Sequence, residues 1–109
     1  MQVKLSFDDS LKQLEGHLDE NAAWIRPDLA PGTSAWQTNT KEEIAVLLVV
    51  CPCGCGNVAS LPVKPGYGGA YWVWDGNVEK PTLRPSIFRS AGCPARWHGF
   101  LTAGVFESC

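Results

Sequence analysis

Three cysteines stand close together in the run Cys51-Pro52-Cys53-Gly54-Cys55. A second group follows near the C-terminal end, where Cys93, His98 and Cys109 occur. Thiolate sulfur and imidazole nitrogen are ligands that Zn²⁺ prefers, usually four of them in a tetrahedron. The sequence therefore predicts a Zn²⁺ site, and these six residues are candidates for its four positions.

The second group has the pattern of a β-hairpin that turns at Ala103-Gly104. In that register His98 and Cys109 lie directly opposite each other on the two strands. Directly opposed residues have Cβ atoms about 5 Å apart, which is close enough to share an ion. We therefore expect His98 and Cys109 to face one metal, with Cys93 joining from the preceding loop.

Other interpretations of these residues stay open. A single histidine is more often a core or surface residue than a ligand, and a cysteine is often a small buried hydrophobe. Iron–sulfur clusters also use thiolates, but the C-x-C spacings here differ from their usual runs. The spacing predicts a metal without deciding which four candidates bind it, or whether the ion is structural or catalytic.

A catalytic zinc keeps one position for water and needs a nearby base to take the proton of that water. Two glutamates are candidates: Glu43, which precedes the apolar run that ends before Cys51, and Glu107, two residues before Cys109. The eight residues from Glu43 to Cys51 span about 26 Å in a straight strand, which disfavours Glu43 for the same ion. Each glutamate has the alternative role of a solvated surface carboxylate.

The elements that must position these residues are mostly β-strands. The apolar, β-branched run Ile44–Val50 predicts a central buried strand that leads into the cysteines. Leu11, Leu14 and Leu18 predict one face of a short helix that begins after Asp8. The other expected strands are Val3–Phe7, Thr33–Thr38, Asn57–Val63, Ala70–Trp74, Ser86–Arg89 and the hairpin Trp97–Cys109. The expected fold is mostly β (α+β), a small antiparallel sheet of hairpins around a zinc site with one short N-terminal helix.

Length and charge narrow the function classes. The 109 residues fit one zinc-binding domain, with a helical extension over about residues 1–30 and a core over about 31–109. A net charge of −2 with scattered basic residues disfavours nucleic acid as a partner. The longest apolar run, Ile44–Val50, is too short to span a membrane, and the first residues do not form a signal peptide. We expect a cytoplasmic protein, whose thiols stay reduced.

The motifs resemble those of a family of small phage and bacterial proteins that is defined as a domain of unknown function. The matching pieces are Glu43, Cys51-Pro52-Cys53-Gly54-Cys55-Gly56, Pro81-Thr82-Leu83-Arg84-Pro85-Ser86-Ile87, Gly92-Cys93, His98-Gly99-Phe100, Gly104-Val105 and Cys109, so the match covers roughly residues 31–109. Members occur near bacterial ubiquitin-like conjugation genes. The resemblance implies a zinc-dependent peptidase that processes or removes a ubiquitin-like protein, its partner.

In that reading Ser86 orients the zinc-bound water or stabilises the oxyanion. The alternative is a turn-capping serine beside Pro85. As a hydrolase, the chain would hold zinc with three ligands and a water, and Tyr71–Trp74 would pair with an extended peptide. A second hypothesis is a structural zinc module that binds a protein partner, with a closed shell of four protein ligands and no chemistry.

Overall fold

The computed structural model describes residues 2–12, 17–18, 24–26, 28–66, 69–89 and 93–109, and most of these lie in or between β-strands. The elements are β1 (Gln2–Lys4), β2 (Ser6–Phe7), the 3₁₀-helix η1 (Asp9–Lys12), β3 (His17–Leu18), β4 (Trp24–Ile25), β5 (Thr33–Thr38), β6 (Ile44–Val50), β7 (Val58–Pro62), β8 (Val73–Trp74), β9 (Leu83–Phe88), β10 (His98–Thr102) and β11 (Val105–Ser108). The expectation of a mostly β fold is confirmed.

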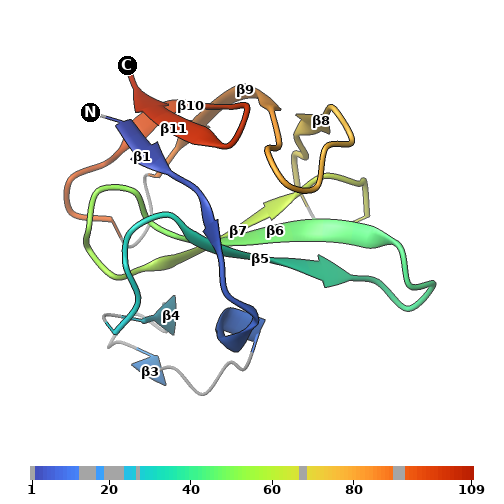
Figure 1. Cartoon of the computed structure of the whole chain (residues 1–109), viewed down its shortest axis with the longest axis horizontal. Coiled ribbons are helices and arrows are strands. Elements are labelled where there is room, and N and C mark those ends of the chain that lie inside the picture. The colour runs from blue at the N-terminus through green and yellow to red at the C-terminus, as the bar shows by residue number, and fades with distance from the viewer. Residues whose placement is uncertain (1, 13–16, 19–23, 27, 67–68, 90–92) are drawn as a thin grey trace.

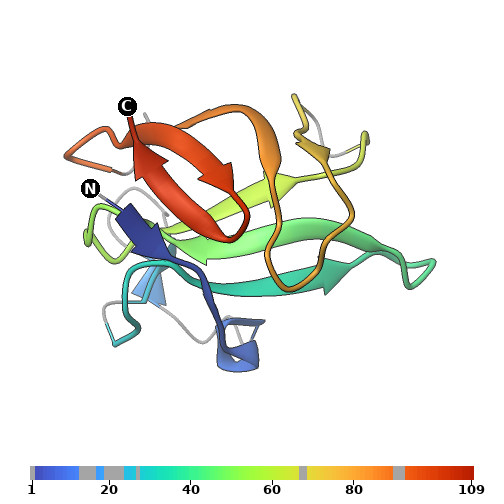
Figure 2. The same cartoon turned by 45° about the horizontal axis from the view of Figure 1, so that its top comes forward.

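The strands form two main sheets that lie as two layers (Figures 1 and 2). One sheet has the order β1-β11-β10-β9-β8, and the other has the order β2-β5-β6-β7. The pair β3–β4 forms a separate ribbon. All described pairings are antiparallel except β2–β5, which is parallel. The chain therefore changes sheet between β1 and β2, at Leu5.

The main core lies between the two layers. The four-stranded sheet contributes the buried residues Trp36, Leu47, Val49, Ala59 and Leu61. The five-stranded sheet contributes Leu83, Ile87, Leu101 and Phe106. Alternate residues of a strand point to opposite faces, which explains why Leu47 and Val49 of β6 and Ala59 and Leu61 of β7 enter this core together.

Strand β6 is buried on both faces, which explains its unbroken apolar sequence. Leu47 and Val49 face the other sheet, whereas Leu48 and Val50 belong to a second buried cluster that includes Leu11 of η1. A strand covered on both sides reads as a continuous apolar run instead of an alternating one. The bounds predicted for β5 and β6 agree with the structure.

The N-terminal helix needs a correction. The described part of that segment is a four-residue 3₁₀-helix, Asp9–Lys12, and His17–Leu18 is a strand. Leu14 lies outside the described residues. Asp8 does cap the turn, because its carboxylate accepts a hydrogen bond from the Ser10 N–H. The leucine spacing looked helical, but the chain at Leu11 forms a short 3₁₀ turn with that side chain buried, and such turns serve well as connectors.

Among the described residues, no helix has the length and hydropathy that crossing a membrane requires.

Candidate metal centre and serine–histidine pair

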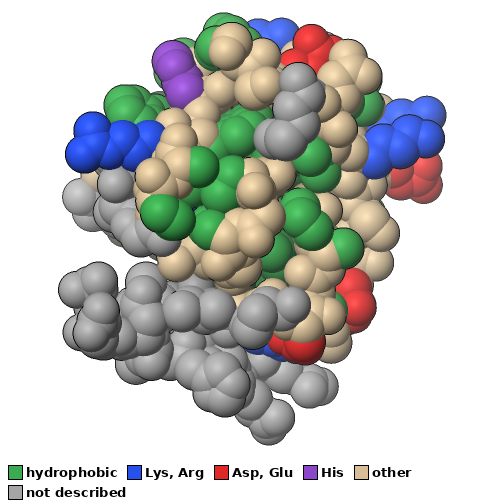
Figure 3. Space-filling model, turned by 90° about the vertical axis from the view of Figure 1, so that its left-hand side faces the viewer, with side chains coloured by type: hydrophobic (Ala, Val, Ile, Leu, Met, Phe, Trp, Pro, Cys, Tyr) green, Lys and Arg blue, Asp and Glu red, His purple; other side chains and the backbone are tan. Residues whose placement is uncertain are grey.

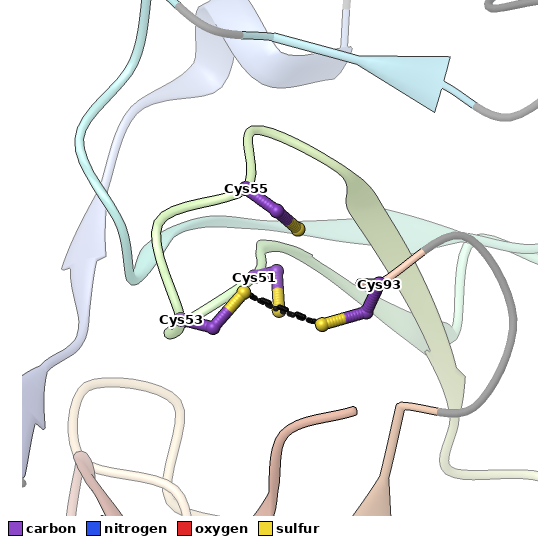
Figure 4. A group of neighbouring side chains, drawn as sticks. All are labelled: Cys51, Cys53, Cys55 and Cys93. Atoms are coloured by element: carbon purple, nitrogen blue, oxygen red, sulfur yellow. Dashed lines mark hydrogen bonds between the residues drawn. The ribbon is translucent and has the colours of Figure 1, made fainter. Parts of the chain in front are cut away.

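The turn between β6 and β7 positions three of the cysteine thiols. The Cys51 N–H donates to the Asn57 carbonyl over 2.8 Å, and the Gly54 N–H donates to the Cys51 carbonyl over 3.1 Å. Gly54 and Gly56 have φ angles of 92° and 82°, a region that glycine enters at little cost. The turn therefore closes tightly, and its three cysteine side chains point towards a common centre (Figure 4).

The fourth thiol comes from the other sheet. Cys93 lies in the connection between β9 and β10, and its sulfur is 3.6 Å from the Cys51 sulfur and 3.3 Å from the Cys53 sulfur. The sulfurs of Cys51 and Cys53 are 3.3 Å apart. Together with the sulfur of Cys55 these three sulfurs make a group of four, all within 4.8 Å of one another. A zinc ion with four Zn–S bonds of about 2.3 Å has sulfur–sulfur edges of roughly 3.8 Å, so the cluster has the size of such a site.

The environment of these thiols favours a bound cation. Burial raises the pKa of Cys51, and burial together with the neighbouring thiols raises the pKa of Cys53. Burial also acts to raise the pKa of Cys93, but a hydrogen bond from the Trp97 backbone and others from the neighbouring thiols lower it to about 7. Crowded thiolates without a cation repel one another, whereas a divalent metal neutralises them and holds them deprotonated. The donor set therefore fits a metal, and a closed four-thiolate shell is typical of a structural site.

The thiol cluster lies where the ends of the two layers meet. The β6–β7 turn and the β9–β10 connection lie at the same end of the molecule (Figures 1 and 2). On that side hydrophobic side chains, a class that includes cysteine, gather near the centre of the face, and charged side chains lie at its edges (Figure 3). A metal at this point would cross-link the two sheets.

The structure places the other two predicted ligands elsewhere. The predicted hairpin register is confirmed: Gly99 pairs with Ser108, and the Cys109 N–H donates to the His98 carbonyl over 2.9 Å. However, His98 and Cys109 are exposed and do not belong to the group of clustered thiols. Strand alternation explains this, because Trp97 and Gly99 are buried and His98 between them faces outward.

His98 is instead hydrogen-bonded to Ser86. The Nε2 atom of His98 is 2.9 Å from the Ser86 Oγ atom. In the β9–β10 pairing His98 is opposite Phe88, and Ser86 precedes Phe88 by two residues on the same face. The register shifts between Gly99 and Leu101, at the part of β9 that contains Ser86. A bulge of this kind re-aims side chains, and here it accompanies the approach of the hydroxyl to the imidazole.

Aromatic and basic groups lie on the same strands as the pair. The Phe88 and His98 rings have centroids 5.4 Å apart. The Arg84 guanidinium lies 5.1 Å from the centre of the Phe100 ring and donates to the Leu101 carbonyl over 3.1 Å. Phe88 and Phe100, two residues after Ser86 and His98 on their strands, are exposed, whereas Ser86 is half-buried.

The backbone of Ser86 is held separately from its hydroxyl. The Trp72 indole N–H donates to the Ser86 carbonyl over 3.3 Å. Trp72 also packs against the main core, so this contact ties β9 to the segment before β8. The Ser86 hydroxyl is therefore presented by a fixed backbone. The alternative role of a turn-capping serine does not describe it, since Ser86 lies inside a strand.

The two candidate glutamates lie apart from the thiols. Glu43 precedes β6 and lies at the opposite end of that strand from Cys51. Its carboxylate is 3.5 Å from the Lys64 ammonium, and the Asn39 amide and then Lys64 lower its pKa. It lines a pocket of about 820 Å³ whose other residues are Thr38, Asn39, Thr40, Lys41, Lys64, Pro65 and Gly66. Glu107 pairs with Phe100 in the register, which places it on the outward face, diagonal to His98.

Sequence reasoning named both Ser86 and His98 but did not pair them. The signal was present, because both residues lie in the blocks that carry the family resemblance. Their contact depends on β9 pairing with β10 across a long connection, and the register of that pairing is set by the bulge and not by a short turn. A serine beside a histidine is the arrangement that activates a hydroxyl nucleophile.

A two-layer β protein with a four-thiol cluster and a serine–histidine pair on one sheet face has the groups of a hydrolase with a structural metal. A family model matches residues 21–109, and the chain belongs to that family, the bacterial ubiquitination-like system serine protease (BubE). No curated protein and no solved structure matches the chain. The expected link to a bacterial ubiquitin-like system is confirmed, and so is the assignment to a protease class. The family description specifies a serine protease, whereas the sequence-based hypothesis gave the nucleophile's role to a zinc-bound water.

Proposed function

We propose that the protein is a serine peptidase that processes or removes a ubiquitin-like protein, with Ser86 as nucleophile and His98 as general base. The observation that carries this proposal is the 2.9 Å contact between His98 Nε2 and Ser86 Oγ. A hydroxyl is a weak nucleophile at neutral pH and needs an adjacent base within hydrogen-bond reach. The family description, a protease of a bacterial ubiquitination-like system, supports both the chemistry and the class of substrate.

The reaction proceeds in two steps on these residues. The Ser86 oxygen attacks the carbonyl carbon of the scissile bond while its proton passes to His98 Nε2. The imidazolium then gives that proton to the leaving group, which departs and leaves an acyl group on Ser86. Water next attacks the acyl carbonyl and gives a proton to His98, which returns it to the serine oxygen as the carboxylate product leaves.

Glu107 is the carboxylate that we assign to orienting His98. It lies on the neighbouring strand and on the same outward face, diagonal to the imidazole. Diagonal cross-strand neighbours are roughly 7–8 Å apart at their backbones, within reach of long side chains. A carboxylate that accepts from the second ring nitrogen fixes the imidazole tautomer and stabilises the imidazolium. Glu43 has no such relation to His98, because it lies in the turn before β6 and pairs with Lys64.

The metal centre, which we propose to be a four-cysteine zinc site, has a structural role in this mechanism. Four thiolates complete the tetrahedral shell of zinc and leave no position for a reacting water. Zinc dependence of the activity would then come from the architecture that the ion stabilises. A reduced compartment such as the cytoplasm keeps these cysteines available as ligands.

The test uses a ubiquitin-like protein with a C-terminal extension, incubated with the wild-type protein and with three variants. Ser86→Ala and His98→Asn are expected to lower the cleavage rate by roughly 10⁴-fold or more. Ser60→Ala is the matched control, since Ser60 is an exposed serine on another strand, β7. A fluorophosphonate probe should label wild type and Ser60→Ala, and mass spectrometry should place the label on Ser86. Cleavage or labelling that persists in Ser86→Ala would exclude Ser86 as nucleophile.

A non-catalytic zinc module is the second candidate function. The closed four-thiol cluster favours it, because such a site supplies no chemistry of its own. In that case the wild-type protein would bind the ubiquitin-like protein without cleaving it, and Ser86→Ala would leave both binding and stability unchanged.

A further inference from the structure

The connection between β9 and β10 carries the metal centre and the serine–histidine pair in one short stretch. Ser86 is in β9, Cys93 is in the connection, and His98 is the first residue of β10. The two ends of the connection are joined by a hydrogen bond from the Arg89 N–H to the Trp97 carbonyl over 2.8 Å. A change in the position of Cys93 therefore acts on the loop that connects the strand of Ser86 to the strand of His98.

Within this loop, Cys93 begins a tight turn that leads to His98. The Arg96 N–H donates to the Cys93 carbonyl over 3.1 Å, and Arg96 has a φ angle of 49°. Trp97 follows this turn, and its carbonyl accepts from the Arg89 N–H. His98 is the next residue. The backbone that carries the Cys93 sulfur into the thiol cluster therefore leads directly to His98.

The Trp97 side chain is fixed as well. It is 5% exposed, and its ring meets the Phe106 ring edge-on with centroids 6.0 Å apart. Gly99 lies against it so closely that a Cβ atom there would come within 2.7 and 2.8 Å of two ring carbons. Because Trp97 and Gly99 face inward together, His98 between them must face outward. The turn at Cys93 and this packing therefore set the direction of the imidazole.

We infer that the metal centre positions His98 for its contact with Ser86, through the turn that begins at Cys93 and the backbone of Trp97. This inference rests on the proposed function and makes Cys93 and Trp97 positioning residues, which touch no reacting atom. A metal-bound thiolate is held in one position, unlike a mobile thiol, so the ion fixes the start of the turn that leads to His98. The alternative is a metal that stabilises the fold as a whole and has no particular link to His98.

The decisive experiment makes the same substitution at two ligands of the same ion. Cys93→His and Cys55→His both keep a three-cysteine, one-histidine set, which zinc accepts. Only Cys93→His changes the ligand in the turn that leads to His98, because Cys55 comes from the β6–β7 turn. With one zinc bound in each variant, we expect kcat to fall about 10- to 100-fold further in Cys93→His than in Cys55→His, with similar KM values. Equal losses in both variants would overturn the inference.

A second measurement does not depend on activity or on zinc binding by a variant. Nitrogen-15 NMR of the imidazoles reports the His98 hydrogen bond, and a His98→Asn variant assigns its signals against those of His17. Titration of the wild-type protein with a zinc chelator should change the His98 signals and speed hydrogen exchange at the Arg96 amide, which donates to the Cys93 carbonyl, while amides of β6 stay protected. Simultaneous loss of protection at Arg96 and β6 would show a general stabilising role and would contradict the inference.

The two proposals fail in different ways. If Ser86→Ala still cleaves the substrate, the proposed function is wrong, yet the NMR and exchange results still decide whether the metal positions His98. If Ser86→Ala is inactive but chelation leaves the His98 signals unchanged, the peptidase assignment stands and the positioning role is excluded.

Discussion

Gly99 offers a sharp test of how the site is packed. It lies between His98 and Phe100 in β10, and a side chain there would point into the protein towards Trp97. An added Cβ atom would also meet the backbone carbonyl of Glu107 on the paired strand. We therefore predict that Gly99→Ala forces the Trp97 ring or the β10–β11 pairing to move.

The magnitude follows from the distances. Two ring carbons of Trp97 would lie 2.7 and 2.8 Å from the new atom, whereas carbon atoms in contact prefer about 3.5–4.0 Å. Overpacking a well-packed interior typically costs about 1–3 kcal/mol. The Glu107 carbonyl belongs to a hydrogen-bonded strand and cannot rotate away as a side chain does. We therefore expect the free energy of unfolding to fall by about 3 kcal/mol, the upper end of that range. For a chain of this length the melting temperature should fall by roughly 10 °C or more.

Gly69→Ala is the matched control, because a Cβ atom at Gly69 meets nothing within 4 Å. Urea unfolding followed by tryptophan fluorescence gives the free energy of unfolding of both variants, and peptidase assays give their kcat. Gly99→Ala should also lower kcat, since the ring that fixes the direction of His98 has moved. The packing argument would be refuted if the free energies of unfolding of Gly99→Ala and Gly69→Ala agreed within about 0.5 kcal/mol.

Three further predictions concern other parts of the molecule. Chelation of the metal should lower the melting temperature and release one zinc per chain, measured by calorimetry and elemental analysis; an unchanged melting temperature with the metal removed would exclude a structural role. Phe88→Ala and Phe100→Ala should each raise KM with little change in melting temperature, because the two rings are exposed on the strands that carry Ser86 and His98; unchanged KM values would show that substrate does not touch them. Glu43→Gln should leave peptidase activity intact and reduce stability at neutral pH only. Because the folded pKa of Glu43 is lowered, its contribution is full above the ordinary value of 4.5 and is lost as pH falls through the folded value. Unfolding midpoints at pH 7 and pH 3 test the sign, and a difference from wild type that grows towards pH 3 would contradict it.

Strand positions could be predicted from the sequence where one local signal dominated. The run Ile44–Val50 is apolar without alternation, and only a strand covered on both faces suits it. The turn at Ala103-Gly104 could also be predicted, because glycine favours the positive φ angles of such turns. Both residues have positive φ angles in the structure. Once the turn was placed, the register of β10 and β11 followed from it.

The thiol cluster could be predicted only in part, since three of its cysteines are local and one is not. Cys51, Cys53 and Cys55 share a turn, so their spacing alone brings them together. Cys93 approaches from the other sheet, and the register that placed His98 opposite Cys109 was correct without making either of them a neighbour of the thiols. The register did not show which face of the sheet His98 occupies. Because Trp97 and Gly99 are buried, His98 between them lies on the outer face.

The Ser86–His98 contact was beyond local reasoning for a different physical reason. It depends on a strand pairing whose register shifts between Gly99 and Leu101, and a shift of this kind leaves no periodic signal in the sequence. The aromatic residues beside the pair also belong to the strand alternation and gave no separate signal.

The short strand β1 has a practical consequence for anyone who trims the chain. The family match begins at residue 21, but residues 2–4 pair with β11, and Leu11 is 1% exposed in the second buried cluster. A truncated protein that starts at residue 21 would leave β11 as a bare sheet edge and would uncover apolar side chains on the far face of β6. Unpaired edges beside apolar surface recruit other chains, so such a fragment is expected to aggregate on expression. Residues 2–11 therefore cover a sheet edge and an apolar face of the region that the family model matches, and they protect it from aggregation.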